Sequence, residues 1–247
     1  PKHQGLTPVI SAEALIGNPY CGGFNAKQNA DRLHQLFPDG RVLLIVREQK
    51  QLIRSLYKTL VTWGMPHTIT RLLHPVDTSL APQFNFDFLR FDLAVFYYQQ
   101  LFGKANVLVL PYEQFQQDPK AFLQQLFEFS GQHSENALHK LPVQKRVNVN
   151  QTLLNLYIQR LHNYLFLSSP FNYAGLFQST ESRTHARLKR SKQNPFPAWI
   201  DNWLEQRFRQ RVLKSCHGQF AESNARLELL TGINVSQYGY ETSDKHE

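Results

Sequence analysis

The sequence predicts a three-layer α/β fold, in which a central parallel sheet is flanked by helices. Two short runs, Val42–Val46 and Val107–Leu110, contain only apolar residues, as expected of strands buried on both faces of a parallel sheet. Apolar residues at helical spacing follow each run, and this alternation is typical of α/β domains. The 247 residues suit one such domain. We therefore expect a single domain over residues 1–247, with residues 198–247 as its helical carboxyl-terminal extension.

The segment before the first apolar run is expected to add a strand, a loop and a helix. Thr7–Ser11 (TPVIS) is a brief strand candidate, and Glu13 follows its end. Pro19 and a pair of glycines then break the pattern. Apolar residues at helical spacing predict a helix over Ala26–Phe37, and Pro38–Gly40 then turns the chain into the strand.

The remainder of the chain is predicted to be mainly helical. Met65–Gln83 contains three prolines and is expected to be irregular. Asp118 precedes Pro119, which is the pattern of an N-cap followed by proline at the first helical position. Helices are expected over Phe84–Phe102, Lys120–Ser130, Thr152–Leu167, Ala198–Cys216 and Phe220–Leu230.

The first apolar run ends at Arg47, and the helix after it carries Ser55 eight residues further on. In open α/β sheets, ligands bind at the carboxyl ends of the strands. An arginine there offers a bidentate fork suited to phosphate, and a serine hydroxyl adds one donor. The pattern alone is weak, because such an arginine is often a solvated charge and a helical serine often bonds the preceding turn.

The composition indicates an anionic partner. The formal net charge is +8 and the isoelectric point is about 9.5, which favours phosphorylated nucleotides, acidic glycans, nucleic acid or a membrane surface. The sequence contains no motif of RNA or DNA binding, so we expect no nucleic-acid partner. No apolar run approaches the ~20 residues that cross a bilayer, and we expect a cytoplasmic protein. Cys21 and Cys216 are too few for a zinc-ligand pattern, and no metal is expected.

Three stretches resemble one enzyme family. The first stretch has Arg47 at a strand end, followed by Ser55 and the aromatic Tyr57. It resembles the 3′-phosphate-binding segment of sulfotransferases that use 3′-phosphoadenosine-5′-phosphosulfate (PAPS). Phe102–Gly131 is similar to the strand, Tyr-Glu, Asp-Pro and helix segment of that family. Asn224–Tyr240 resembles the ending of its bacterial carbohydrate-type members. The resemblance spans most of the chain, with the motifs in the right order.

The resemblance implies a P-loop-NTPase-like fold and transfer of a sulfuryl group from PAPS to a hydroxyl or amine. A carbohydrate acceptor is favoured by the carboxyl-terminal ending alone, and no metal is implied. Arg47 and Ser55 would hold the 3′-phosphate. Lys145 and Arg146 lie in a loop that resembles the family's late cofactor-contacting segment. Tyr112 and the glutamate after it are expected to hold the structure together.

The family uses His or Glu as the catalytic base, and Glu13 is our candidate, because the resemblance places the TPVIS strand near the acceptor. The alternative is that Glu13 is a first-turn acid that complements a helix dipole. His3 and His67 are further candidates, although each has the pattern of an ordinary surface histidine. The basic run Arg183–Lys192 either binds an acidic acceptor glycan or forms a solvated face.

The sequence departs from the family in the segment that binds the phosphosulfate group of PAPS. Sulfotransferases of this type open with a strand and a P-loop-like turn, and no such segment is visible in this sequence. We therefore expect that the domain is amino-terminally incomplete and that this chain is inactive without the P-loop segment. Two alternatives stay open. A P-loop kinase-like protein would need a Walker A loop and magnesium ligands, and a non-catalytic basic module would bind polyanions or nucleic acid with a steep salt dependence.

Overall fold

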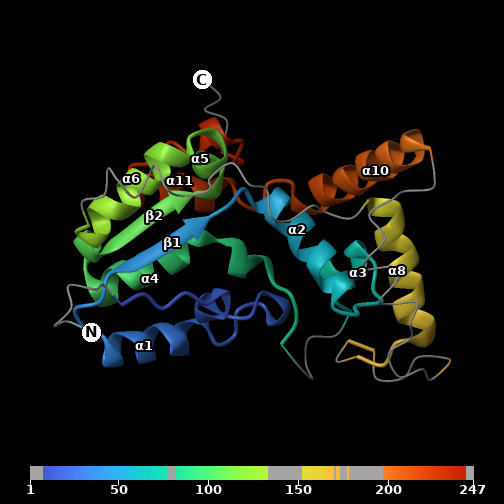
Figure 1. Cartoon of the computed structure of the whole chain (residues 1–247), viewed down its shortest axis with the longest axis horizontal. Coiled ribbons are helices and arrows are strands. Elements are labelled where there is room, and N and C mark those ends of the chain that lie inside the picture. The colour runs from blue at the N-terminus through green and yellow to red at the C-terminus, as the bar shows by residue number, and fades with distance from the viewer. Residues whose placement is uncertain are drawn as a thin grey trace. The chain divides into compact units, whose positions relative to one another are not determined.

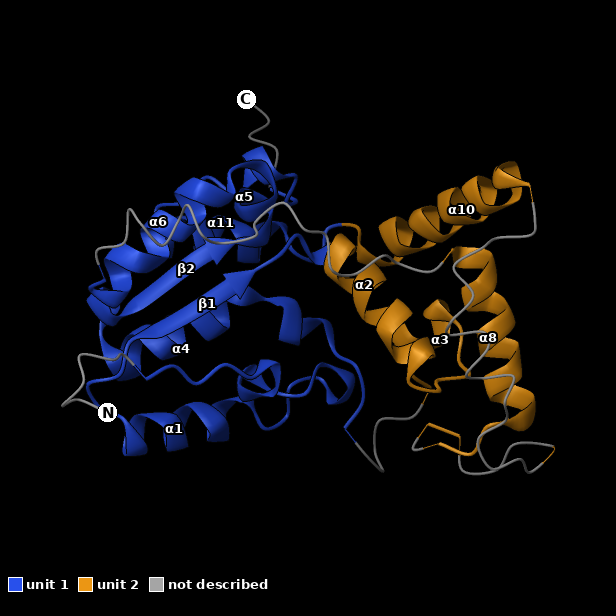
Figure 2. Ribbon diagram, in the orientation of Figure 1, with its two compact units in different colours: residues 1–49, 77–145, 218–247 blue, residues 50–76, 146–217 orange. Residues whose placement is uncertain are grey.

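The computed structural model describes residues 8–76, 82–132, 152–169, 171–172, 177 and 197–242 (Figure 1). The chain divides into two compact units (Figure 2). The first unit contains residues 1–49, 77–145 and 218–247, and the second contains residues 50–76 and 146–217. The boundary after residue 49 falls inside a helix, so one continuous helix begins in the first unit and continues in the second.

The first unit is mixed α/β. Its elements in chain order are η2 (Glu13–Ile16), η3 (Pro19–Cys21), α1 (Ala26–Leu36), β1 (Val42–Val46), η4 (Phe86–Leu89), α4 (Phe91–Phe102), η5 (Lys104–Asn106), β2 (Val107–Pro111), α5 (Tyr112–Gln117), α6 (Pro119–Ser130), α11 (Ala221–Thr231) and η6 (Ser236–Tyr238). Helix α4 packs against both strands and against α11, and α5 packs against β2. Its core includes the fully buried Val95, Leu110 and Leu227.

The second unit is helical in its described part. It contains most of α2 (Gln49–Thr62), then α3 (Ile69–Leu73), α8 (Leu153–Phe166) and α10 (Ala198–Cys216). Tyr57 of α2 and Phe208 of α10 are fully buried, and their rings pack with centroids 5.4 Å apart. Helix α10 belongs to the second unit and α11 to the first, and the expectation that residues 198–247 are an extension of one domain stays a prediction. The prediction of a single domain over 1–247 stays a prediction.

The two predicted strands form, and they pair in parallel. Val42 lies opposite Val107, and the register continues without interruption to Val46 opposite Pro111. This confirms a mixed α/β chain with parallel pairing. The expectation that both strands are buried on both faces is wrong for β1, because Ile45 is 53% exposed. Helix α4 packs against the strands, and the described elements leave the side chain of Ile45 partly uncovered.

The strand predicted over Thr7–Ser11 does not form in its described residues, 8–11. Val9 and Ile10 are 80% and 61% exposed. Their β-branched side chains favour extended backbone, but a strand also needs a ladder partner and a surface on which to pack. Neither is present at this segment in the described part of the chain.

Two helical predictions needed correction. The helix expected over Phe84–Phe102 is interrupted at Arg90, because the Asn85 side chain accepts the backbone N–H of Asp87 and begins a separate turn, η4. The stretch expected to be irregular contains α3, which Thr68 caps by accepting the N–H of Arg71 at 3.2 Å. These caps add helical turns that apolar periodicity does not reveal.

Asp118 caps α6 as predicted, accepting the N–H of Ala121 at 3.0 Å, with Pro119 at the first helical position. Among the described helices, none has the length and apolar character needed to cross a membrane.

Candidate functional site

Arg47 lies between the end of β1 and the start of α2, with an unpartnered nitrogen. Its Nε is buried and has no hydrogen-bond acceptor among the residues that the structure describes. Its guanidinium carbon lies 5.0 Å from the centroid of the Tyr112 ring, a cation–π contact. In the described ranges Arg47 forms neither an ion pair nor a hydrogen bond through its side chain. A buried charged donor without an acceptor is costly, and an anionic ligand would satisfy it.

The parallel register brings Tyr112 to Arg47. Paired residues of the two strands are 65 positions apart, from Val42 and Val107 onward. The same offset relates Arg47 to Tyr112 and Glu48 to Glu113, which directly follow the two strands. We had assigned Tyr112 only to the structure, and its ring contact with Arg47 was missed. Aligning the two apolar runs of the sequence in parallel would have found it.

Glu113 fixes the turn that carries Arg47. Its carboxylate is buried, and Oε1 accepts the backbone N–H of Glu48 at 3.0 Å. Its Oε2 accepts the hydroxyl of Tyr240 at 3.3 Å. Burial, together with the negative charge of Glu113, holds the pKa of Tyr240 far above its usual value, so the phenol stays protonated and donates. Glu113 thus has the structural role that the sequence predicted.

A second buried link joins the same turn to the carboxyl-terminal segment. The side chain of Gln49, the first residue of α2, donates from Nε2 to Oδ1 of Asn224 at 2.6 Å. Asn224 donates in turn from Nδ2 to the backbone oxygen of Glu241 at 2.8 Å. Both amide side chains are fully buried. All three stretches that resemble sulfotransferases therefore contribute side chains around the carboxyl end of β1 in the first unit.

Ser55 lies on α2 in the second unit and is half-buried. Its backbone oxygen accepts the hydroxyl of Thr59 at 3.1 Å. Its own hydroxyl has no hydrogen bond to any residue that the structure describes. The role of Ser55 at a 3′-phosphate stays a prediction.

The structure places Glu13 as the alternative interpretation predicted, in the first turn of a helix. It is exposed and is the acid in the first turn of η2. Burial and then the charge of Glu13 raise the pKa of Tyr20 to about 12, which indicates that the two side chains are close. The strand whose end was to present Glu13 does not form, so its role as a base loses that support and stays a prediction.

Of the other candidate bases, His67 has a pKa lowered by partial burial and by the charge of Arg71, and its backbone oxygen accepts the hydroxyl of Tyr57 at 3.1 Å. His3 lies outside the described residues, as do Lys145, Arg146 and the basic run 183–192. Within the residues that the structure describes, no group of three or more His, Cys, Asp or Glu side chains could hold a metal ion.

One of three comparisons with known proteins found a match. No curated protein and no solved structure gave a significant match to the chain. A model of the sulfotransferase family matches residues 25–135, which include β1, Arg47, α2 up to Thr62, β2 and Glu113. Members of such a family transfer sulfuryl groups. Residues 25–135 of this chain are therefore similar to the sulfotransferase family.

Proposed function

We propose that the protein is a PAPS-dependent sulfotransferase, in which Arg47 binds the 3′-phosphate of the nucleotide. One observation carries the proposal: within the family-matched segment, the arginine at the carboxyl end of β1 has a buried Nε that finds no acceptor in the described part of the chain. The reaction would transfer a sulfuryl group from PAPS to a hydroxyl or amine, and a carbohydrate is the favoured acceptor. Adenosine 3′,5′-bisphosphate would be the other product.

The proposal assigns a part to each candidate residue. Arg47 supplies a guanidinium fork, and Ser55 supplies one further donor to the same phosphate. The first turn of α2 begins two residues after Arg47, and the positive end of a helix dipole favours an anion there. Lys145 and Arg146 would contact the phosphates of the adenosine nucleotide. Glu13 would accept the proton of the acceptor hydroxyl as its oxygen attacks the sulfur.

The surrounding fold belongs to the same proposal. A three-layer P-loop-like domain, with its central parallel sheet flanked by helices, would hold β1 and β2 side by side. Supporting this is the parallel register of the two strands, with Arg47 and Tyr112 emerging at one edge. Ligands of open α/β sheets bind at that edge. A bacterial origin would follow from the carbohydrate-type ending.

The proposal is tested by calorimetric titration with adenosine 3′,5′-bisphosphate and with adenosine 5′-monophosphate. The wild-type chain should prefer the bisphosphate, because only this nucleotide carries the 3′-phosphate. Arg47→Ala should lose about 2–4 kcal/mol of bisphosphate affinity, or roughly 30- to 1,000-fold, and should bind the monophosphate as before. Arg47→Lys keeps the charge but loses the fork, and an intermediate loss is expected.

Arg41→Gln is the matched control, because Arg41 precedes the other end of β1 and donates to the backbone oxygen of Phe129. This variant should bind the bisphosphate like the wild type. Equal, weak binding of both nucleotides, unchanged in Arg47→Ala, would refute the proposal. That result would favour the non-catalytic polyanion-binding module, whose affinity should fall steeply with salt.

A further inference from the structure

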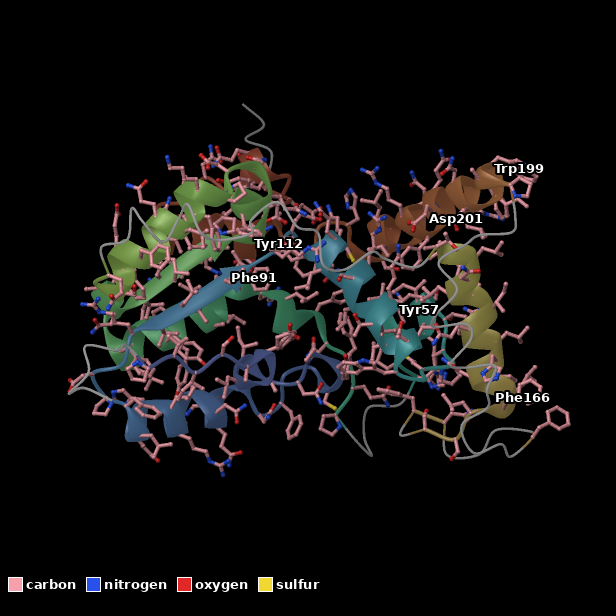
Figure 3. All side chains as sticks on the ribbon, in the orientation of Figure 1. Tyr57, Phe91, Tyr112, Phe166, Trp199 and Asp201 are labelled. Atoms are coloured by element: carbon pink, nitrogen blue, oxygen red, sulfur yellow. The ribbon has the colours of Figure 1, made fainter. Side chains whose placement is uncertain are left out.

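Helix α10 of the second unit presents a continuous row of aromatic and cationic side chains. Trp199, Trp203, Arg207 and Arg211 follow one another at intervals of four residues, and we call this set the α10 ridge. Side chains at this spacing are neighbours on a helix surface, and the row spans about 18 Å. Trp199 is 69% exposed and Trp203 is 48% exposed. Trp199 lies at the amino-terminal end of the helix (Figure 3).

The tryptophans are not part of the core of the unit. The opposite side of α10 supplies that core through Phe208, Val212 and Cys216, each fully buried. Two large apolar rings on a solvent-facing row are unusual for a surface helix and indicate a binding surface. The guanidinium carbon of Arg207 lies 4.6 Å from the centroid of the Trp203 ring. A cation and an aromatic surface are thus held together at the middle of the ridge.

The cations of the ridge are not neutralised by the acids of their own helix. Asp201 accepts the backbone N–H of Leu154 at 3.0 Å, at the start of α8. Glu205 forms its ion pairs with two cations of α2, at 3.1 and 2.6 Å. Neither Arg207 nor Arg211 has an ion-pair partner among the residues that the structure describes.

Helix α8 extends the same pattern beside the ridge. Helices α8 and α10 pack together, and the guanidinium carbon of Arg160 lies 5.2 Å from the centroid of the Tyr157 ring. Burial raises the pKa of Tyr157, and the charges of Arg211 and Arg160 oppose that rise, so both cations lie near this ring. Tyr157 and Arg160 are both half-buried, and they place a further aromatic ring and a further cation beside the ridge.

We propose that the α10 ridge, with Tyr157 and Arg160 of α8, binds an acidic oligosaccharide. Pyranose rings would pack on the indole faces, and carboxylate or sulfate groups would accept hydrogen bonds from the arginine forks. The choice of a glycan rests on the proposed function, since such a ligand would be the acceptor or a longer chain that contains it.

A membrane is a poorer occupant of this surface. An interfacial helix inserts a broad apolar face among the acyl chains, and the apolar face of α10 is already buried inside the unit. Single-stranded nucleic acid stacks on aromatic rings with cations nearby, and the experiment must separate it from a glycan.

The test is titration of the full chain with a heparin-derived hexasaccharide, followed by intrinsic fluorescence. The chain has three tryptophans, and two of them belong to the ridge, so binding should change the signal. Maltohexaose, a neutral oligosaccharide, and a twelve-nucleotide oligothymidylate are the comparison ligands. The hexasaccharide should bind at least about tenfold more tightly than either, because only it combines pyranose rings with dense negative charge.

Variants locate the binding surface, and calorimetry measures their affinities. Two double variants should each weaken hexasaccharide binding about tenfold or more. One combines Trp199→Ala with Trp203→Ala, and the other combines Arg207→Gln with Arg211→Gln. Arg209→Gln is the matched control, because this exposed arginine points away from the ridge on the same helix, and it should change the affinity less than about twofold. Trp199→Phe with Trp203→Phe keeps aromatic rings at both positions and should retain most of the affinity.

Three results would overturn the inference: no binding of the hexasaccharide by the wild type, equal losses in Arg209→Gln and in the ridge variants, or tighter binding of the oligothymidylate. Titration of the same variants with adenosine 3′,5′-bisphosphate separates this inference from the proposed function. The ridge variants should bind that nucleotide like the wild type. A wild type that binds the hexasaccharide but not the bisphosphate would contradict the proposed function and leave the ridge as a glycan-binding surface.

Discussion

Removing the carboxylate of Glu113 should destabilise the first unit strongly. The buried carboxylate accepts two hydrogen bonds, from the Glu48 amide at 3.0 Å and from the Tyr240 hydroxyl at 3.3 Å. A hydrogen bond to a charged group contributes about 1.5–3 kcal/mol, and the longer bond belongs at the lower end. Glu113→Ala should therefore lower the free energy of unfolding by about 4 kcal/mol, which includes the cost of leaving the two donors unpaired.

Thermal unfolding followed by circular dichroism measures this effect. For a chain of this size, a loss of about 4 kcal/mol should lower Tm by roughly 8–16 °C. Glu113→Gln keeps an oxygen for the Glu48 amide and should lose less than half as much. Glu222→Ala is the control, because Glu222 is exposed and pairs with Arg226 on the surface, where an ion pair contributes little. If Glu113→Ala melted within about 2 °C of the wild type, the two bonds would not hold the Arg47 turn as we argue.

Three further predictions concern the second unit. Phe208→Ala removes a fully buried ring and should cost about 4 kcal/mol in denaturant unfolding; a cost below about 1 kcal/mol would mean that this core is not packed as described. Burial raises the pKa of Glu205, but the ion pairs with Lys58 and Arg54 outweigh it, so the pKa lies below its ordinary value of 4.5. The stability that these pairs contribute should be complete above that value and should be lost as the pH falls through the lowered pKa. When the pH is lowered to about 3, Tm should therefore fall less in Glu205→Gln than in the wild type. An equal fall in Tm would contradict the assignment. Gly64→Ala should lower Tm measurably, because φ is 108° there and a Cβ would lie 2.9 Å from a leucine side-chain carbon; an unchanged Tm would show that this turn relaxes freely.

The strands and the position of Arg47 at the end of β1 could be predicted because their signals are local. Val42–Val46 contains apolar residues alone and ends at a charged residue, and the structure has β1 over the same five residues. The cap of α6 at Asp118 was predictable for the same reason, since an N-cap and its proline are adjacent in the sequence. The pattern does not reveal what covers each strand, so the exposure of Ile45 was not anticipated.

The features that the sequence did not reveal depend on distant contacts. Thr7–Ser11 has strand propensity, but whether a strand forms depends on a partner, and residues 8–11 pair with none of the described strands. The buried bond between Gln49 and Asn224 joins residues 175 positions apart, and no spacing rule relates them. The contact of Arg47 with Tyr112 was accessible in principle, because it continues the register of two strands that had both been identified.

The central claim is that Arg47 binds the 3′-phosphate through the nitrogen that lacks an acceptor. Nuclear magnetic resonance of the arginine Nε–H groups tests it most directly, with the Arg47→Lys variant to assign the Arg47 signal. Adenosine 3′,5′-bisphosphate should shift this signal downfield and slow its exchange with water, because the Nε–H would then donate to a phosphate oxygen. Adenosine 5′-monophosphate should leave the signal unchanged. An Arg47 signal that does not move while the bisphosphate binds would contradict the account.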